Sequence, residues 1–383
     1  MDHASEELIT FRTSLCGKLC TILYVGLRAV FRFIIWTLNN LYCIPVHFCW
    51  LFLLQPLKWI AKDKYWFIEG IMFRWLLSMV CLWSYSTGYH VVEVGDDFLD
   101  LIEERTLVLF NHQSTADVPL IMAAFNSREG LSNNIMWIMD HVFKLTNFGL
   151  VSLAHGDFFI HGGPKYRDAS LLELGSHLAK FYMPRKRKWL VLFPEGGFLK
   201  NKIQASHRYA DKNNLPKLNN VAYPRIGALK VIMDAAAADH HSDGSDKIKY
   251  LLDVTIAYPG GRPIDLQTIF GGWRPSCDTV FYYRKFNIEE VPRERDALES
   301  WLFQRYQEKE DILQEYYNTG RFPVLPTPHN PEHQHESIRT LPGSRVVHDP
   351  IDFILRHCFY IASTWLWLQI FYWIYLSLSR LLW

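Results

Sequence analysis

The sequence predicts an α/β protein in which a central mixed sheet is flanked by helices and membrane helices lie at both ends of the chain. Of the 383 residues, 49% are hydrophobic, and the apolar residues crowd towards the two ends. Between about residues 90 and 320, short apolar runs alternate with helical segments interrupted by polar residues, as in α/β folds. We therefore divide the chain into N-terminal membrane-embedded helices at 1–89, an α/β unit at 90–320, a flexible linker at 321–350 and a C-terminal membrane helix at 351–383.

Charge and cysteine content exclude several classes of protein. The formal net charge of +1 argues against a nucleic-acid-binding protein, which usually carries a large basic excess. The seven cysteines lie mostly in or near apolar segments and never form a Cys-x-x-Cys pair, so we expect neither disulfides nor a metal site. The acidic start, residues 1–7, lacks the basic region of a cleaved signal peptide, so we expect any insertion signal to be retained.

The first membrane segment is the uncharged stretch from Phe33 to Leu57. Its 25 residues, as a helix, would span roughly 37 Å against a hydrocarbon core of about 30 Å. Asn39, Asn40, Pro45 and His47 interrupt the stretch, so a kinked span or a re-entrant hairpin fits about as well as a straight span. Basic residues lie on both sides of it, so the positive-inside rule leaves the orientation open.

Two further apolar stretches follow. Trp66 to Tyr89 contains Glu69 and Arg74 and is rich in Trp and Tyr, which predicts an interfacial helix or a tilted partner of the first span. His357 to Ser379 contains no Asp, Glu, Lys or Arg, which predicts a membrane helix, with a buried amphipathic helix as the alternative.

Strands of the α/β unit are predicted from its short apolar runs. These are Leu107 to Phe110, Gly149 to Leu153, Trp189 to Phe193, Leu251 to Ala257 and Val280 to Tyr283. Residues 321–350 hold several Pro and His with little apolar periodicity, which predicts a linker. The His329 to His335 cluster within it could bind metal, but no Cys or fixed ligand spacing accompanies it, so a solvated linker is preferred.

The polar turn after Leu107 to Phe110 holds the first candidate site. On one regular helix His112 and Asp117 would point roughly 140° apart, so only a turn could bring them together. Residues 111–116 supply that turn, and Pro119 suits the first turn of a following helix. Asp117, at or beside the helix N-cap, could then accept a hydrogen bond from one imidazole nitrogen and leave the other free to take a proton.

The His-x4-Asp spacing alone is weak evidence. His241 and Asp246 repeat it in a polar run without a preceding strand, which indicates a solvated loop. A turn histidine that caps backbone groups is the alternative for His112. Ser114 lies between His112 and Asp117 but has no Gly-x-Ser-x-Gly sequence around it, which argues against a serine nucleophile.

Four further stretches lie at the ends of predicted strands, where open α/β sheets gather their sites. They are His155 to His161, Phe193 to Phe198, Ala222 to Gly227 and Val254 to Pro259. The second places Glu195 on a Pro/Gly turn, where backbone amides could approach a ligand and the carboxylate could accept a hydrogen bond from a hydroxyl. A plain turn with a solvated Glu is the alternative.

Taken in this order, the motifs resemble those of the glycerolipid acyltransferase family, typified by lysophosphatidate acyltransferase. The first motif, Asn-His-x4-Asp, is met by Asn111, His112 and Asp117, and the third, Phe-Pro-Glu-Gly, by 193–196. The second is met in part by Gly156, Phe159 and Ile160, but His161 stands near where an Arg is expected, with Arg167 as a candidate substitute. Val254 to Pro259 matches the fourth motif loosely.

The surrounding residues look like the lysophosphatidylglycerol acyltransferase branch. The stretches that carry this likeness are Asp140-His141, 146–149, 157–160, 195–198 and 255–259. Long apolar ends also fit that branch, for which the resemblance implies the endoplasmic reticulum membrane, with a multi-pass or hairpin anchor.

The resemblance implies acyl transfer from acyl-CoA, as co-substrate and without a further cofactor, to a free glycerol hydroxyl of a lysophospholipid such as lysophosphatidylglycerol or lysophosphatidylethanolamine. His112 would act as general base and Asp117 would fix its tautomer. Glu195 and Gly196, with Gly156 nearby, would lie at the acyl acceptor. Asn111 belongs to the same motif and is assigned to substrate binding with them.

Two basic features complete the expected site. Arg225, on a Pro-Arg-x-Gly turn, is a candidate bidentate phosphate donor. The run Arg185 to Lys188 could meet the phosphates of CoA or anionic headgroups, although a solvated charge run is more common.

Two alternatives to this function remain open on the sequence. One is the same chemistry on lysocardiolipin or monoacylglycerol. The other is a catalytically silent, lipid-binding membrane protein, for which His161 is the one supporting feature and which the trio of His112, Asp117 and Glu195 opposes. The sequence leaves the acceptor and the oligomeric state undetermined.

Overall fold

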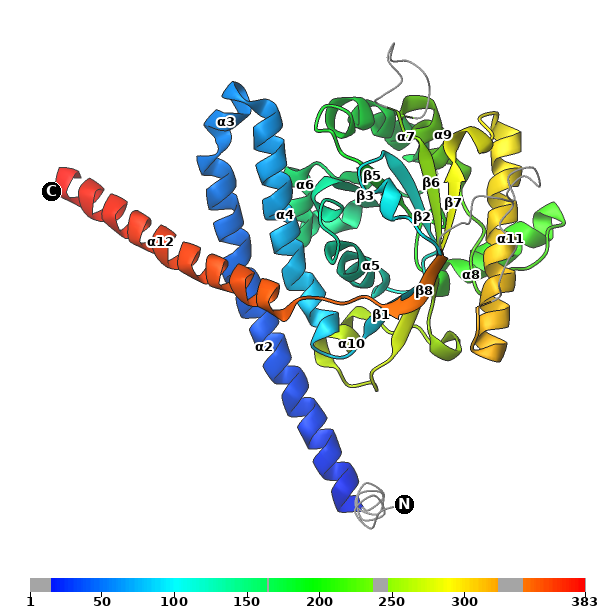
Figure 1. Ribbon diagram of the computed structural model, residues 1–383, viewed down its shortest axis with the longest axis horizontal. Helices are drawn as coiled ribbons and strands as arrows, with labels where there is room; N and C mark the ends of the chain where they lie inside the picture. Colours follow the sequence, from blue (N-terminus) through cyan, green and yellow to red (C-terminus); the bar gives the residue numbers. More distant parts are fainter. Residues whose placement is uncertain (1–14, 164, 237–246, 323–339, 383) are drawn as a thin grey trace.

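The computed structural model describes residues 15–163, 165–236, 247–322 and 340–382, and a single eight-stranded sheet lies at its centre (Figure 1). The spatial order is β4-β3-β5-β2-β6-β7-β1-β8. The strands are β1 His90–Asp96, β2 Thr106–Phe110, β3 Ile135–Asp140, β4 Phe158–Ile160, β5 Trp189–Leu192, β6 Tyr250–Ala257, β7 Asp278–Asn287 and β8 Thr340–Arg345. All pairs are parallel except β6 with β7 and β1 with β8, so the predicted mixed sheet is confirmed.

Helices cover both faces of this sheet. They are α2 Leu15–Leu53, α3 Gln55–Ile60, α4 Lys62–Tyr85, α5 Asp117–Asn126, α6 Asn147–His155, α7 Arg167–His177, α8 Leu199–Asn213, α9 Ile226–Ala236, α10 Leu266–Gly271, α11 Arg295–Thr319 and α12 Pro350–Leu382. Shorter helical turns are η1 Leu99–Leu101, η2 Ser132–Asn134, η3 His141–Leu145, η4 Leu178–Tyr182, η5 Pro259–Gly261 and η6 Ile288–Glu290.

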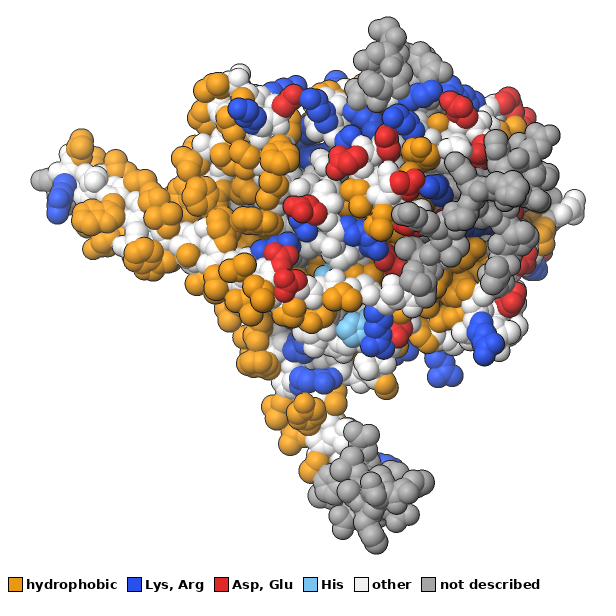
Figure 2. All heavy atoms as spheres, in the orientation of Figure 1, with side chains coloured by type: hydrophobic (Ala, Val, Ile, Leu, Met, Phe, Trp, Pro, Cys, Tyr) orange, Lys and Arg blue, Asp and Glu red, His pale blue; other side chains and the backbone are white. Residues whose placement is uncertain are grey.

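Among the described residues, three helices, α2, α4 and α12, are long and apolar enough to cross a membrane. Figure 2 shows hydrophobic side chains along the part of the molecule that these helices form. Helix α2 is continuous through Pro45 and the chain reverses only at α3, so this stretch is one helix and not a re-entrant hairpin. The returning helix α4 lies beside α2, where Trp36 and Trp83 pack at 6.3 Å between ring centroids. These helices could therefore form a membrane anchor of more than one span, with α4 as the expected partner of the first.

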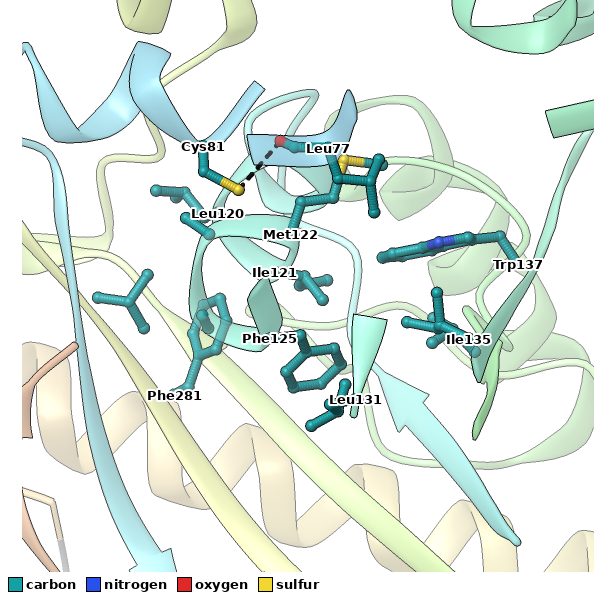
Figure 3. Packing of buried hydrophobic residues seen from close by; sticks show 14 of the residues in the cluster. Leu77, Cys81, Leu120, Ile121, Met122, Phe125, Leu131, Ile135, Trp137 and Phe281 are labelled. Carbon is teal, nitrogen blue, oxygen red and sulfur yellow. Dashed lines mark hydrogen bonds between the residues drawn. The ribbon is translucent and has the colours of Figure 1, made fainter. Parts of the chain in front are cut away.

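Helix α4 also packs onto the α/β unit, which α2 and α12 do much less. In the most apolar stretch of α4, 56% of the residues are buried, against 6% in the corresponding stretches of α2 and α12. Leu77 and Cys81 of α4 face Leu120 and Phe125 of α5 in one hydrophobic core (Figure 3). This contact fixes the height of the sheet relative to the membrane helices.

Side chains along each strand point alternately to the two faces of the sheet, and each face has its own hydrophobic core. Val108 and Phe110 face α4 and α5, whereas Leu107 and Leu109 face α7, α9 and α11. The fully buried β2 is therefore held from both sides, as expected for a central parallel strand. This leaves the residues that follow Phe110 rigidly placed.

Two predicted elements differ from the structure. Gly149 to Leu153, expected as a strand, belongs to helix α6, whose N-cap Thr146 accepts a hydrogen bond from the amide of Gly149. An apolar run of five residues does not by itself separate a buried strand from a helical turn. Within the expected linker, residues 340–345 form β8, an edge strand in which Pro342 is tolerated.

Candidate active site

The site forms where the parallel strands end. The chain leaves β2 at His112, β5 at Glu195 and β6 at Tyr258, and these three strands are parallel neighbours. Their carboxyl ends therefore meet at one edge, the carboxyl edge of the sheet, which is where open α/β sheets place ligands. The opposite side, where the same strands begin, is the amino edge.

His112 and Asp117 are brought together by the turn between β2 and α5. Imidazole Nδ1 of His112 lies 2.9 Å from Oδ2 of Asp117, and the amides of Gln113 and Ser114 donate to the same oxygen at 2.7 and 2.9 Å. A carboxylate oxygen only accepts, so Nδ1 carries the proton. The neutral ring then has its lone pair on Nε2, which makes no hydrogen bond within the described part of the chain.

Two phenylalanines hold the imidazole in its plane. Phe193 stacks on it at 4.2 Å and Phe198 lies at 4.3 Å between ring centroids. The carbonyl of His112 also accepts a hydrogen bond from the amide of Leu199 at 2.7 Å. Only 9% of His112 is exposed, so its rotamer is fixed before any substrate arrives.

Glu195 is directed inward. Its Oε1 accepts from the amide of His112 at 2.9 Å and its Oε2 from the amide of Ala222 at 3.1 Å, with 2% of the residue exposed. Burial raises the pKa of Glu195 to about 8, opposed by these two amides. Both oxygens are thus directed at backbone amides of the turns around the site, and the hydrogen bond from Glu195 to an acceptor hydroxyl stays a prediction.

Asn111 is likewise turned into the sheet. Its side-chain amide donates to the carbonyl of Ile256 at 3.0 Å and its oxygen accepts from the amide of Ile256 at 2.7 Å. The residue is fully buried, so it joins β2 to β6 rather than reaching a substrate as expected. A motif position does not reveal the direction of its side chain.

A cationic pair, Arg225 and Lys202, flanks the Pro-Glu-Gly-Gly turn. A Cβ built on Gly196 would lie 3.6 Å from the guanidinium of Arg225, and one on Gly197 would lie 2.5 Å from Cε of Lys202. The amide of Arg225 donates to the carbonyl of Pro194 at 2.8 Å, which fixes its loop against the turn. Lys202 is half-buried, and burial together with Arg225 lowers its pKa. Lys202 lies one helical turn into α8, outside every motif that the sequence pattern singles out.

Gly156 lies at the other side of the molecule. It precedes β4, at the amino edge, in a left-handed conformation with φ +95°, and a Cβ there would lie 2.5 Å from Arg185. Gly156 therefore does not lie near the acceptor as expected. The stretch His155 to His161 runs across β4 from one edge of the sheet to the other, and only His161 lies at the carboxyl edge.

The basic run Arg185 to Lys188 is also at the amino edge, away from His112, and only Lys186 within it is exposed. Arg185 stacks over Trp66 at 3.8 Å, Lys186 pairs with Asp63 at 2.7 Å, and Arg187 is buried against Glu69 at 2.7 Å. All three partners belong to α4. The run therefore attaches the sheet to a membrane helix.

The remaining candidates lie at the periphery of the carboxyl edge. His161 stacks on His141 at 4.1 Å, and Arg167 is exposed at the first turn of α7, beyond β4. The hydroxyl of Ser114 donates to the carbonyl of Ile264, so it is not free to act as a nucleophile. No group of three or more potential metal ligands occurs among the residues described, and both His329 to His335 and His241 to Asp246 lie outside those residues.

The arrangement can perform one kind of chemistry directly. A carboxylate-supported imidazole with a free Nε2 can take a proton from an alcohol and return it to a leaving group. The cationic pair beside it can bind an anionic group such as a phosphate.

The chain is similar in sequence to known acyltransferases. The acyltransferase family model matches residues 90–257, and the acyltransferase C-terminus model matches residues 268–344, which reach into β8. The chain is 45% identical over 308 residues to acyl-CoA:lysophosphatidylglycerol acyltransferase 1 of Homo sapiens, covering 77% of this chain and 83% of that protein. It is 27% identical over 268 residues to lysocardiolipin acyltransferase 1 of Danio rerio, covering 70% and 66%.

Among solved structures, the 1-acyl-sn-glycerophosphate acyltransferase PlsC of Thermotoga maritima aligns with a TM-score of 0.40 and 12% identity, covering 73% of this chain and 98% of that one.

Proposed function

The chain belongs to the glycerolipid acyltransferase family, on its lysophosphatidylglycerol acyltransferase branch, and from this membership we propose that it transfers a fatty acyl group from acyl-CoA to a glycerol hydroxyl of lysophosphatidylglycerol. The enzyme is a membrane-associated acyltransferase that acts on a lysophospholipid. Acyl-CoA is the proposed donor and co-substrate, with no further cofactor. The endoplasmic reticulum membrane is the proposed location, tested by co-localisation in cells.

Proton transfer at Nε2 of His112 is the proposed chemical step. The nitrogen takes the proton of the acceptor hydroxyl while that oxygen attacks the thioester carbonyl carbon. The tetrahedral intermediate collapses with loss of the C–S bond, and the CoA thiolate leaves with the proton from the imidazolium. Asp117 stabilises the imidazolium between these steps, and no acyl-enzyme forms. The hydrogen bond of 2.9 Å from Nδ1 to Asp117 is the observation that carries this proposal.

The acceptor phosphate is proposed to bind Arg225 and Lys202. Both side chains flank the Gly196 and Gly197 turn, beside Glu195, which holds the amide of His112. A phosphodiester bound there would orient the glycerol hydroxyl towards Nε2. The cationic pair favours an anionic lysophospholipid over uncharged monoacylglycerol, while lysophosphatidylethanolamine and lysocardiolipin remain rival acceptors.

An acyl-transfer assay with the purified protein tests the proposal. Labelled acyl-CoA is offered with lysophosphatidylglycerol, lysophosphatidylethanolamine, lysocardiolipin and monoacylglycerol in turn. We expect the highest kcat/KM with lysophosphatidylglycerol and a loss of roughly 10²- to 10⁴-fold in kcat for His112→Ala. His241→Ala is the matched control, because His241 has the same spacing to an aspartate and is expected to be dispensable.

Two results would contradict the proposal. Equal turnover by the wild type and His112→Ala would show that His112 is not the general base. A higher kcat/KM with another acceptor would show that lysophosphatidylglycerol is not the preferred substrate, while the proposed chemical step would still hold.

A further inference from the structure

Asp117 has a second partner besides the histidine. The hydroxyl of Tyr258 donates to Oδ1 of Asp117 at 2.6 Å, whereas the imidazole and two backbone amides use Oδ2. Neither Tyr258 nor Asp117 has measurable exposure. The two oxygens of one carboxylate thus join β6 to the His112 turn.

We propose that Tyr258 is a positioning residue for the acyl transfer, which acts through Asp117 to fix the orientation and basicity of His112. The inference rests on the proposed function, because it needs His112 as the general base. Tyr258 directly follows Ala257, the last residue of β6, and β6 pairs along β2, so the hydroxyl reaches the carboxylate from the end of a paired strand. Sites supported by packed strands hold their geometry closely.

The direction of the hydrogen bond follows from the surroundings. Burial and the nearby Asp117 raise the pKa of Tyr258 well above its usual range, so the phenol stays protonated and donates. A charge-assisted hydrogen bond of this kind disperses negative charge on the carboxylate. Asp117 then attracts the imidazolium less strongly than a carboxylate without that donor would.

Other ionisable groups face this pair. Glu195 lies near Asp117, Lys309 of α11 lies near Glu195, and Tyr317 and Cys277 lie near Tyr258. Every variant compared below keeps these groups, so their titration enters each pH profile equally. A difference between profiles therefore reports the Tyr258 hydroxyl.

Tyr258→Phe removes the hydroxyl and keeps the ring. We expect kcat with acyl-CoA and a lysophospholipid to fall roughly 10- to 100-fold, because hydrogen bonds to charged groups are among the stronger ones, while the acceptor KM stays within about twofold. The acid limb of the kcat/KM profile should move to higher pH, because the carboxylate holds positive charge on the imidazole more strongly. Site-specific 3-fluorotyrosine, a stronger donor of nearly the same size, should move that limb to lower pH.

Tyr283→Phe is the matched control. The hydroxyl of Tyr283 donates to Oε1 of Glu93 at 2.8 Å, so it too is a fully buried tyrosine bonded to a carboxylate, but in β7 and β1. It should lower the melting temperature comparably and leave kcat and the pH profile unchanged. A merely structural Tyr258 would behave in the same way.

A double-mutant cycle with Asp117→Asn completes the test. If Tyr258 acts through Asp117, adding Tyr258→Phe to Asp117→Asn should change kcat by less than about twofold. Unchanged kcat and acid limb in Tyr258→Phe, or additive losses in the cycle, would overturn the inference and leave the proposed function intact. An inactive wild type would instead refute the proposed function, and the inference with it.

Discussion

Glu195 lies beneath the His112 turn, and its protonation couples folding to pH. Burial raises its pKa from 4.5 to about 8, so folding takes up a proton at this group between those values. The stabilising contribution of the carboxyl group is complete below the unfolded-state value. It is lost as the pH rises through about 8.

Glu195→Gln should therefore remove one component of the pH dependence of stability. The wild type should lose up to about 1.4 kcal/mol of unfolding free energy per pH unit, relative to the variant, between about pH 5 and 8. The Gln amide would also place an NH₂ group against a backbone N–H, which lowers kcat by displacing the His112 turn. Thermal unfolding in detergent from pH 5 to 9 measures this, and parallel curves for both proteins would contradict it.

Lys202 and Arg225 make a prediction about substrate binding. Lys202→Ala or Arg225→Ala should raise the KM for a lysophospholipid roughly 10-fold or more with little change in kcat, because each removes a charge-assisted contact to phosphate. Monoacylglycerol, which lacks phosphate, should not discriminate between variant and wild type. Lys200→Ala is the matched control, since Lys200 is exposed on the same helix. Equal effects of Lys200→Ala and Lys202→Ala would refute the assignment.

At the scale of whole elements, α4 is attached to the amino edge of the sheet through buried charges. Glu69 accepts from Arg187 at 2.7 Å and lies 2.7 Å from Nδ1 of His155, whose Nε2 lies 2.9 Å from the carbonyl of Ile135. Both imidazole nitrogens face acceptors, and Phe73 stacks on the ring at 3.5 Å. The charges in the predicted interfacial helix are therefore buried contacts to the catalytic unit.

Glu69→Gln should be strongly destabilising. It leaves the buried Arg187 without its carboxylate, a change that typically costs about 3–5 kcal/mol. Asp63→Asn is the matched control, because Asp63 pairs with Lys186 between the same two segments but is 67% exposed. That variant should melt close to the wild type. Melting temperatures of both variants decide the matter, and equal shifts would show that burial does not set the strength of this attachment.

Local patterns in the sequence predicted the elements around His112, and tertiary contacts decided the rest. His112 and Asp117 are five positions apart between a strand and a helix, so their meeting follows from a short turn. The inward direction of Glu195 depends on the amides of His112 and Ala222, which are distant along the chain. Tyr258 stood beside a recognised proline, but nothing in the sequence pairs it with Asp117.

The expected position of Gly156 was wrong because the sequence does not show at which edge of the sheet a motif residue lies. The family resemblance implies a place near the acyl acceptor for Gly156, which lies instead at the amino edge. Since β4 has only three residues, Phe158–Ile160, one motif reaches both edges of the sheet. The length of that strand could not be read from an apolar pair.

At the scale of the whole molecule, α12 is divided between packing and membrane contact. Its buried residues, Phe353, Arg356, Tyr360 and Ser363, all lie in its first half. Phe353 and Tyr360 belong to the core that also contains α4 and α5 residues. The later half presents apolar side chains such as Trp373 and Leu381, 60% and 84% exposed, as a membrane-facing surface requires.

Two truncations should separate these roles. Deleting 368–383 should leave the melting temperature in detergent near that of the full chain, because the buried half of α12 remains. Deleting 350–383 should lower it by roughly 10 °C or more, because it uncovers the core around Phe353 and Tyr360. Both proteins should stay in the membrane pellet after carbonate washing, since α2 remains. Equal destabilisation by the two deletions would mean that the exposed half of α12 also supports the fold, and release of either protein would mean that α2 and α4 do not anchor it alone.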